Sequence, residues 1–306
     1  MKRDVVGRDS AQAGGTETAL GAGTGTSAGR ARLVSIRPAR GPMFPDLQEL
    51  WRSRHVLSAL VWRNVARRYR QTLLGPIWFI ISPLIRMVLF SLVLGRIAGL
   101  PSDGVPYPIF TYTALLPWEL FANGATRGAA CFVTYQNIIS KIYFPRLIVP
   151  TAEVLTALVD FCLSFAILLV MAVLYGFPLT AKLLVLPLLL GIAMVLALGV
   201  GLLLASLQAR YRDVSNILNY VIQFWFYGTP VAYSATVVND RLPEWLLFLY
   251  RLNPMNGVVE GFRWVLLDAG RAPDLTLALS AAALVLFLIV SSMVFLRTEH
   301  SIVDLV

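Results

Sequence analysis

The sequence predicts an all-α integral membrane protein with six transmembrane helices, an N-terminal amphipathic helix at the membrane interface, and short re-entrant helices between the fifth and sixth spans. Of the 306 residues, 57% are hydrophobic and only 14% are charged, and the mean hydropathy is +0.70, which is unlike an ordinary soluble domain. Several apolar runs reach the roughly 20 residues that a helix needs to cross a ~30 Å hydrocarbon core. A soluble chain of this size could not bury all of these runs in one core.

Residues 1–42 are predicted to form a disordered cytoplasmic tail, and residues 43–306 the membrane domain. The tail is rich in Gly, Ala, Thr and Ser without apolar periodicity, so it cannot bury enough surface to offset the cost of ordering. Its glycines do not form a phosphate-binding loop, since no Gly-Lys-Ser/Thr follows them. The tail also lacks the apolar core of a cleavable signal peptide, so we expect the first span to direct insertion.

A basic amphipathic helix is predicted from Leu47 to Tyr69. Its apolar residues recur at helical spacing, and its arginines share a different face: Leu50, Leu57, Val61 and Val65 against Arg52, Arg63, Arg67 and Arg70. Such a helix suits the membrane surface, with its arginines among lipid phosphates. The alternative is a soluble helix packed on a partner protein.

Six apolar runs are assigned as transmembrane helices, at residues 77–98, 109–132, 147–175, 183–207, 214–233 and 275–296. The net charge of +9 is concentrated near the N-terminus, where 13 of the 26 Lys and Arg residues precede Gly75. Basic residues beside a span typically face the cytosol and anionic lipid. Both termini are therefore placed in the cytosol, and no nucleic-acid partner is expected.

The connection between the fifth and sixth spans contains two short apolar pieces, Trp245–Tyr250 and Val258–Leu267. Each is too short to cross a bilayer. We expect a pair of short helices that dip into the outer leaflet and are broken at Asn253-Pro254. Irregular backbone at membrane depth is tolerated where it lines a cavity or is buried in protein.

Four charged residues within the predicted spans are candidate intramembrane charges: Arg86, Glu119, Glu153 and Asp160. A charge at the bilayer centre costs about 2.5–3.5 kcal/mol, so such side chains face the protein interior or a wet pathway. Glu153 and Asp160 are two helical turns apart and share one face. A salt bridge from Arg86 to one of them is one explanation. A proton relay is less favoured, since neither His55 nor His300 lies in a span.

Aromatic residues gather where the predicted helices meet the interfaces, and eight of them are candidates for lining a channel or gate: Trp118, Phe121, Trp225, Tyr227, Tyr233, Trp245, Phe262 and Trp264. For any single residue an interfacial aromatic belt is the simpler interpretation. The alternative is a conduit in which flat rings stack on a sliding polymer, because stacking tolerates many registers.

The segment between the second and third predicted spans combines apolar and basic residues: Asn137, Ile138, Ile139, Lys141, Ile142, Tyr143, Phe144 and Arg146. It is predicted to form a short cytosolic helix that ends at Pro145. A simple connector scarcely needs so many large apolar side chains, so a docking surface is favoured.

The sequence contains no pattern typical of a catalytic or metal site. Cys131 and Cys162 lack CxxC spacing and a histidine partner, so both are interpreted as small buried thiols. There is no nucleophile elbow, no metal-ligand spacing and no Ser/His/Asp grouping.

Taken together, the motifs of residues 47–306 resemble the permease subunits of type-2 ABC exporters, in the family that exports polysaccharides and polyol phosphates such as O-antigen, capsule or teichoic acid. The motifs that carry the resemblance are Arg68-Tyr69-Arg70, Leu74-Gly75-Pro76-Ile77-Trp78, Leu116-Pro117-Trp118, Lys141-Ile142-Tyr143-Phe144-Pro145-Arg146, Tyr211-Arg212-Asp213-Val214, Gly228-Thr229-Pro230-Val231, Leu252-Asn253-Pro254 and Glu260-Gly261-Phe262-Arg263. Each is weak alone, but their order and spacing are specific.

The resemblance implies a homodimeric permease in the bacterial cytoplasmic membrane, joined to two copies of a separate ATPase that binds ATP and Mg. It implies a lipid-linked glycan as cargo and no cofactor in this chain. By the same resemblance, residues 137–144 match the coupling helix that seats in the ATPase, residues 52–70 match the interface helix, and the short helices near Trp245 and 261–267 match an outer gate. The family offers no role for the N-terminal tail.

Two other functions are considered. One keeps the exporter class but changes the cargo to a drug or a small lipid. The other is an integral-membrane glycosyl- or acyltransferase, for which Glu153 or Asp160 would be the catalytic candidates. No catalytic grouping accompanies those carboxylates, so the chain is expected to be a transport subunit rather than an enzyme.

Overall fold

The computed structural model describes residues 51–70, 77–139, 144–211, 213–239 and 243–302. The chain divides into two units, Met1–Arg40 and Gly41–Val306. The predicted tail and Leu50 lie outside the described residues. Within the described part of the second unit the regular structure is entirely helical, as the sequence predicts.

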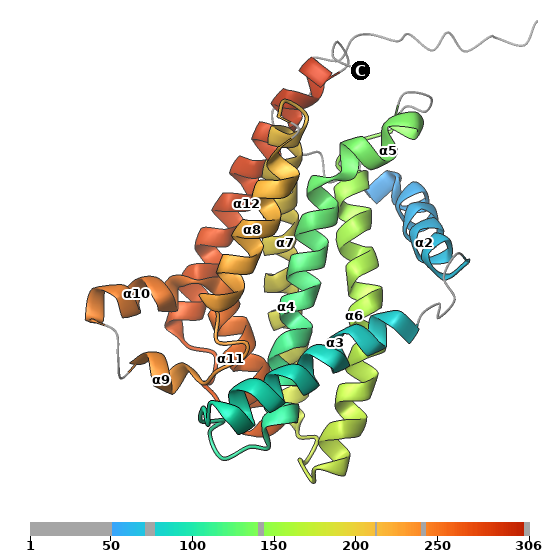
Figure 1. Ribbon diagram of the computed structural model, residues 1–306. Helices are drawn as coiled ribbons and strands as arrows, with labels where there is room; N and C mark the ends of the chain where they lie inside the picture. Colours follow the sequence, from blue (N-terminus) through green and yellow to red (C-terminus); the bar gives the residue numbers. More distant parts are fainter. Residues whose placement is uncertain (1–50, 71–76, 140–143, 212, 240–242, 303–306) are drawn as a thin grey trace, which may run out of the picture. The chain divides into compact units, whose positions relative to one another are not determined.

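The helices follow the chain in the order shown in Figure 1. The longer elements are α2 (Arg54–Arg70), α3 (Ile77–Phe90), α4 (Tyr107–Ala129), α6 (Ile148–Leu174), α7 (Leu186–Gln208), α8 (Val214–Tyr227), α11 (Pro254–Leu267) and α12 (Leu275–Ile302). The shorter ones are η1 (Ser91–Ile97), a π-helical continuation of α3, α5 (Cys131–Ile139), η2 (Ala181–Val185), α9 (Ala235–Asn239) and α10 (Glu244–Leu252). In Figure 1, α2 and α5 lie toward one end of the bundle, and α9 and α11 lie toward the other.

Helix α4 is the centre of the bundle. It packs against α3, α6, α7, α8 and α11, and every side chain from Ile109 to Trp118 is buried. A helix enclosed by other helices does not need a fully apolar surface, because protein rather than lipid surrounds it. Because α4 has this position, it can carry the polar residues Glu119 and Arg127 in its interior.

Within the part of the chain that the structure describes, four segments are long and apolar enough to cross a membrane: Ile80–Ile97, Ile148–Leu174, Ala181–Gln208 and Leu275–Thr298. They coincide with four of the six predicted spans. The other two predicted spans correspond to α4, which is long but carries polar residues, and to α8, which has 14 residues and is therefore roughly 21 Å long.

The connection between α8 and α12 contains the two predicted short helices. The helical break falls at Asn253-Pro254 as predicted, because the Asn253 side chain caps α11 by accepting a hydrogen bond from the Met255 backbone N–H at 3.1 Å. Pro254 then occupies the first helical position, where its missing N–H is not needed.

Small residues let α4 and α7 approach closely. A Cβ built on Gly201 would lie 3.3 Å from the Cα of Gly128 and 3.5 Å from the Ala125 carbonyl oxygen. One turn away on α4, a Cβ on Gly124 would lie 3.1 Å from the Ala197 methyl. Close backbone contact of this kind is a typical basis of helix association in membranes, where dispersion forces replace the hydrophobic effect.

We therefore expect Gly201→Val to destabilise the protein by about 1–3 kcal/mol, because the added methyl groups push α4 away from α7. The measurement is the thermal unfolding midpoint in detergent. Gly191→Val is the matched control on the same helix, since a Cβ at Gly191 meets no atom within 4 Å. Equal midpoints for the two variants would contradict the close packing of α4 and α7.

Candidate functional site

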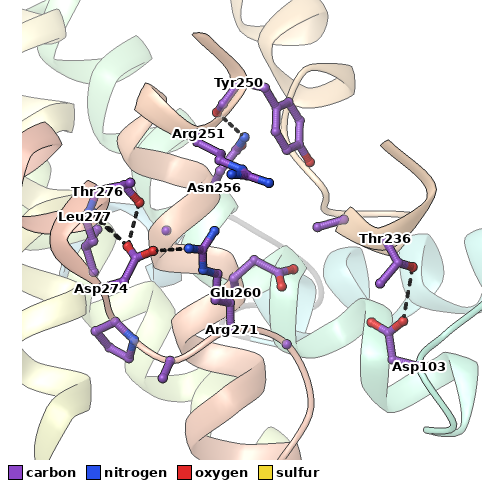
Figure 2. Close-up of a pocket in the computed structure, with 15 residues that line it drawn as sticks. Asp103, Thr236, Tyr250, Arg251, Asn256, Glu260, Arg271, Asp274, Thr276 and Leu277 are labelled. Atoms are coloured by element: carbon purple, nitrogen blue, oxygen red, sulfur yellow. Dashed lines mark hydrogen bonds and ion pairs between the residues drawn. The ribbon is translucent and has the colours of Figure 1, made fainter. Parts of the chain in front are cut away.

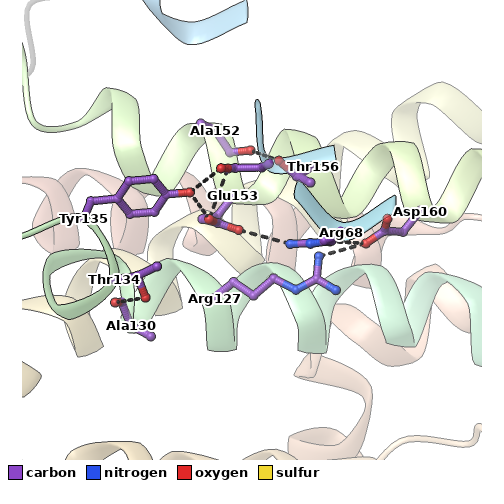
Figure 3. Close-up of polar contacts among 10 residues, drawn as sticks. Arg68, Arg127, Ala130, Thr134, Tyr135, Ala152, Glu153, Thr156 and Asp160 are labelled. Atoms are coloured by element: carbon purple, nitrogen blue, oxygen red, sulfur yellow. Dashed lines mark hydrogen bonds and ion pairs between the residues drawn. The ribbon is translucent and has the colours of Figure 1, made fainter. Parts of the chain in front are cut away.

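The two acidic residues of α6 lie on one face, two turns apart, as predicted from their spacing, and both are buried. Together with Asn64, Arg68, Arg127 and Tyr135 they form what we call the polar cluster (Figure 3). Its residues come from α2, α4, α5 and α6.

Asp160 is shared by two arginines from different helices. Its Oδ2 accepts hydrogen bonds from Nη1 of Arg68 on α2 at 2.7 Å and from Nη1 of Arg127 on α4 at 2.8 Å. The second guanidinium nitrogen of Arg68 donates to Glu153 Oε2 at 3.4 Å. Arg68 thus bridges both carboxylates of α6, and the four charges sum to zero.

Glu153 has two further partners. The Tyr135 hydroxyl of α5 donates to Glu153 and lies 2.6 Å from the Asn64 side-chain oxygen. The Asn64 amide nitrogen donates to Glu153 Oε1 at 3.1 Å. Because an unpaired buried carboxylate would be very costly, this set of donors explains why Glu153 can be placed in the bundle.

The cluster fixes α2 to the bundle through charge as well as packing. Burial lowers the pKa of Arg68, the positive charge of Arg127 lowers it further, and Asp160 and Glu153 act in the opposite direction. An arginine stays protonated under such conditions. Arg68 therefore remains a cation that cannot leave α6 without separating opposite charges in a medium of low dielectric constant.

The salt bridge considered between Arg86 and a carboxylate of α6 is wrong. Arg86 Nη1 instead pairs with Glu119 Oε1 at 2.9 Å, because α3 packs on α4 and brings Arg86 beside that helix. The sequence reasoning missed Arg68 and Arg127 as partners of Glu153 and Asp160. The available signal was Arg127 itself, a cation inside a predicted span.

The predicted arginines of α2 and its approach lie in different surroundings. Arg52 and Arg67 are exposed, whereas the Arg63 guanidinium lies 4.9 Å from the centre of the Tyr135 ring. The side chain of Arg70 lies outside the described residues. Trp51 and Trp62 are 70% and 74% exposed, so aromatic as well as basic side chains cover the outward side of this segment.

The predicted docking segment is only partly described. Asn137, Ile138 and Ile139 form the last residues of α5, and Lys141 and Tyr143 lie outside the described residues. Arg146 is half-buried. Phe144 is buried in an apolar cluster with Leu60 and Phe132. Its ring therefore packs inside the chain and does not form part of an open surface.

The predicted channel aromatics separate into two groups. Trp118, Phe121 and Trp225 pack edge to face, with 4.9 Å between the rings of Phe121 and Trp225. Trp118 and Phe121 are buried and Trp225 is half-buried. Phe262 is buried against Phe161. The remaining four lie nearer the surface, although Tyr233 and Trp264 are half-buried: Tyr227, Tyr233, Trp245 and Trp264.

Helix α8 presents a face that mixes amides and aromatic rings. The residues that share it are all exposed: Asn216, Asn219, Tyr220, Gln223, Phe224 and Tyr227. Their spacing of three or four residues places them along one side of the helix. Burying amides against lipid tails without partners costs several kcal/mol, so this face, which we call the α8 face, is suited to a wet passage or another protein surface.

The α8 face was only partly predicted. Sequence reasoning chose Trp225 and Tyr227, yet Trp225 points inward and donates its Nε1–H to Asn253 Oδ1 at 3.1 Å. The helical spacing of Asn216, Asn219 and Gln223 with the aromatics was the signal that could have identified the face.

Side chains rather than secondary structure hold the loop that follows α8. The fully buried Arg263 of α11 donates to the Val231 carbonyl at 3.0 Å, pairs with Glu260 at 2.9 Å, and lies 3.6 Å from the centre of the Phe110 ring. The Tyr107 hydroxyl donates to the Ala232 carbonyl. The contacts of Arg263 and Tyr107 thereby hold the loop, α4 and α11 together.

The cysteines differ from the prediction in one respect. Cys131 is buried, but Cys162 is exposed on α6, because it lies on the side of that helix that the rest of the bundle does not cover. Within the described residues, no group of three or more His, Cys, Asp or Glu side chains is arranged to hold a metal ion.

Comparison with known proteins gives a consistent match. The family model described as ABC-2 type transporter matches residues 55–267. The O-antigen export system permease protein RfbA of Myxococcus xanthus is 29% identical over 261 residues, which cover 84% of this chain and 98% of the relative. RfbA of Klebsiella pneumoniae is 24% identical, over 68% of this chain and 78% of the relative. The polysialic acid transport protein KpsM of Escherichia coli is 21% identical, over 67% and 78%.

The polar cluster gives a stability prediction. Asp160→Asn leaves two arginines without their shared carboxylate and should cost about 2–3 kcal/mol, less than the ~3–5 kcal/mol of a fully buried pair, since the arginine side chains remain 19% and 22% exposed. The measurement is thermal unfolding in detergent. Asp268→Asn is the control, because that carboxylate is 78% exposed and its left-handed backbone suits Asn. An unchanged midpoint for Asp160→Asn would contradict the shared ion pair.

Proposed function

The chain belongs to the ABC-2 type transporter family, and on this premise we propose that it is the permease subunit of an ATP-driven exporter that moves a lipid-linked polysaccharide across the bacterial cytoplasmic membrane. The polysaccharide is of the O-antigen, capsule or teichoic acid kind. The relatives support this class of cargo, since their names refer to O-antigen export and polysialic acid transport.

The single observation that carries the proposal within this chain is the α8 face. A glycan presents hydroxyl groups and flat apolar ring faces, so a conduit for it needs hydrogen-bonding side chains interleaved with aromatic rings. Asn219 and Gln223 offer the former, and Tyr220 and Phe224, which are 65% and 76% exposed, offer the latter. Two copies of the permease that meet along α8 would enclose such a conduit.

The membrane crossing follows from the same arrangement. Helices α4 and α8 add to the four apolar spans to make six, because α4 is shielded by its neighbours and α8 by the conduit and the second copy. Both termini then lie in the cytosol. Helices α10 and α11 enter the outer leaflet as re-entrant segments and gate the conduit.

Energy reaches the conduit through the cytosolic end of the bundle. Two copies of a separate ATPase bind ATP and Mg and seat the segment around residues 137–144. Their closure displaces this segment together with α2. The polar cluster transmits the displacement to α6 and from there to α4, because its ion pairs join α2 to α6 and α6 to α4. Differential binding of the ATPase to two permease states drives the change.

A reconstituted assay tests the function. We expect the permease co-purified with its ATPase to move lipid-linked glycan across proteoliposomes only when ATP is present. The double variant Tyr220→Ala/Phe224→Ala should lower the glycan transport rate at least tenfold, because the aromatic rings that stack on the sugar rings along the α8 face are lost. Association with the ATPase should stay unchanged. The measurement is enzymatic accessibility of the glycan on the far side of the membrane.

The matched control is Val170→Ala/Val173→Ala on α6, where both side chains are exposed on a helix that does not contribute to the α8 face. Transport of a fluorescent drug or phospholipid with no transport of glycan would refute the proposed cargo. Transferase activity of the isolated permease would refute the exporter.

The coupling segment has a test of its own. Tyr143→Asp should abolish co-purification of the ATPase, since an unpaired carboxylate in an apolar interface costs several kcal/mol, whereas Tyr143→Phe should retain it. Phe144→Asp is unsuitable for this purpose, because Phe144 is 9% exposed within the chain and the change would disturb folding. Full ATPase recovery with Tyr143→Asp would contradict the coupling assignment.

A further inference from the structure

A pocket of about 390 Å³, lined by charged and polar groups and by a larger area of apolar atoms, lies at the α9–α11 end of the bundle (Figure 2). Its walls come from the turn between α3 and α4, from α9, α10 and α11, and from the segment that leads into α12. The volume lies within the ~300–1,000 Å³ typical of small-molecule sites.

The pocket walls are held in place by hydrogen bonds. Asn256 of α11 donates to the Tyr250 carbonyl at 2.6 Å, which joins α10 to α11. Arg271 pairs with Asp274 at 2.6 Å. Gly270 has φ +83, and a Cβ there would lie 2.9 Å from the Glu260 carbonyl oxygen, so the segment can run this close only because it has no side chain. The pocket is preorganised, which lowers the entropic cost of filling it.

The charges around the pocket are balanced. The acidic side chains in its lining are Asp103, Glu260 and Asp274, and the basic ones are Arg251 and Arg271. Glu260 is also paired with Arg263 behind the wall, so three cations face three anions. A ligand with net charge of either sign would meet repulsion from part of this lining. A neutral ligand would not.

The hydrogen-bonding groups suit a molecule with many hydroxyls. Carboxylates accept hydrogen bonds from hydroxyls, guanidinium groups donate to hydroxyl oxygens, and the hydroxyls of Thr236 and Tyr250 do both. In Figure 2 the carboxylate of Glu260 and the hydroxyl of Tyr250 face the space bordered by Thr236. The Tyr250 hydroxyl is buried and makes no hydrogen bond of ordinary geometry in the described part of the chain. The Tyr233 hydroxyl is its neighbour and interacts with it electrostatically.

Apolar atoms complete the lining, including those of Leu277 and Pro273. A pyranose ring has one polar edge and an apolar face, so it can use both kinds of surface. We propose that this pocket is a binding subsite for one or two neutral sugar residues of the glycan as it reaches the outer end of the permease. This inference rests on the proposed function, since it takes the cargo to be a glycan.

The test measures binding of short oligosaccharides to the permease–ATPase complex in lipid nanodiscs by saturation-transfer difference NMR. The probes are fragments of two to four sugar residues, released by mild acid from the surface polysaccharide of the producing bacterium. The wild-type complex should bind them with millimolar affinity. Thr236→Val/Tyr250→Phe should weaken binding about tenfold, since each lost hydroxyl removes a hydrogen bond worth ~0.5–1.5 kcal/mol.

The matched control, Thr134→Val/Tyr175→Phe, makes the same chemical changes at exposed positions outside the pocket lining and should bind as the wild type does. Glycerol 3-phosphate is the charged competitor and should not displace the oligosaccharide. Three results would overturn the subsite: no binding to a complex that exports glycan in proteoliposomes, equal binding by the pocket variant and the control, or displacement by glycerol 3-phosphate. Because export is measured on the same complex, loss of the subsite and loss of the proposed function are separate outcomes.

Discussion

The organisation of this protein depends on the sharing of one carboxylate, Asp160, by two arginines from different helices. In a bundle surrounded by lipid, each of these charges alone would be too costly to bury. Together with Glu153, which also pairs with Arg68, they form a neutral group that requires α2, α4 and α6 to keep their relative positions. Glu153 extends this group to α5 through Tyr135. A helix at the edge of the bundle is thereby tied to the most enclosed one.

A second group of polar contacts, centred on Arg263, holds the end of the bundle opposite to the polar cluster. Arg263 is completely buried, and its two terminal guanidinium nitrogens donate to Glu260 and to two carbonyls of the loop after α8, while the guanidinium lies over the face of Phe110. Asp103 accepts hydrogen bonds from Ser234 at 2.7 Å. The two groups share α4, which contributes Arg127 to one and Phe110 and Tyr107 to the other. In the proposed exporter, a displacement of α4 would therefore move both ends of the bundle.

The charged and aromatic residues show where prediction from sequence stops. The spacing of Glu153 and Asp160 was sufficient to place them on one face, because helical periodicity is local. Their cations could not be identified in this way, since Arg68 lies 85 and 92 residues away along the chain. Likewise, aromatic content suggested a conduit, but only the packing of Trp225 against Phe121 shows that this ring faces inward while Phe224 faces outward.

The amino-acid sequence is enough to predict that the chain is helical and suited to a membrane, where four of its spans run, and that a helix breaks at Asn253-Pro254. Each of these follows from composition, run length or a local backbone restriction. The folded structure was needed to show that α4 is enclosed and that Arg86 pairs with Glu119. It was also needed to show that Phe144 is buried and Cys162 exposed, each contrary to expectation, and that α8 has amides and aromatic rings on one side. The physical reason is that burial and charge pairing depend on which distant helix packs alongside, and no local pattern specifies that neighbour.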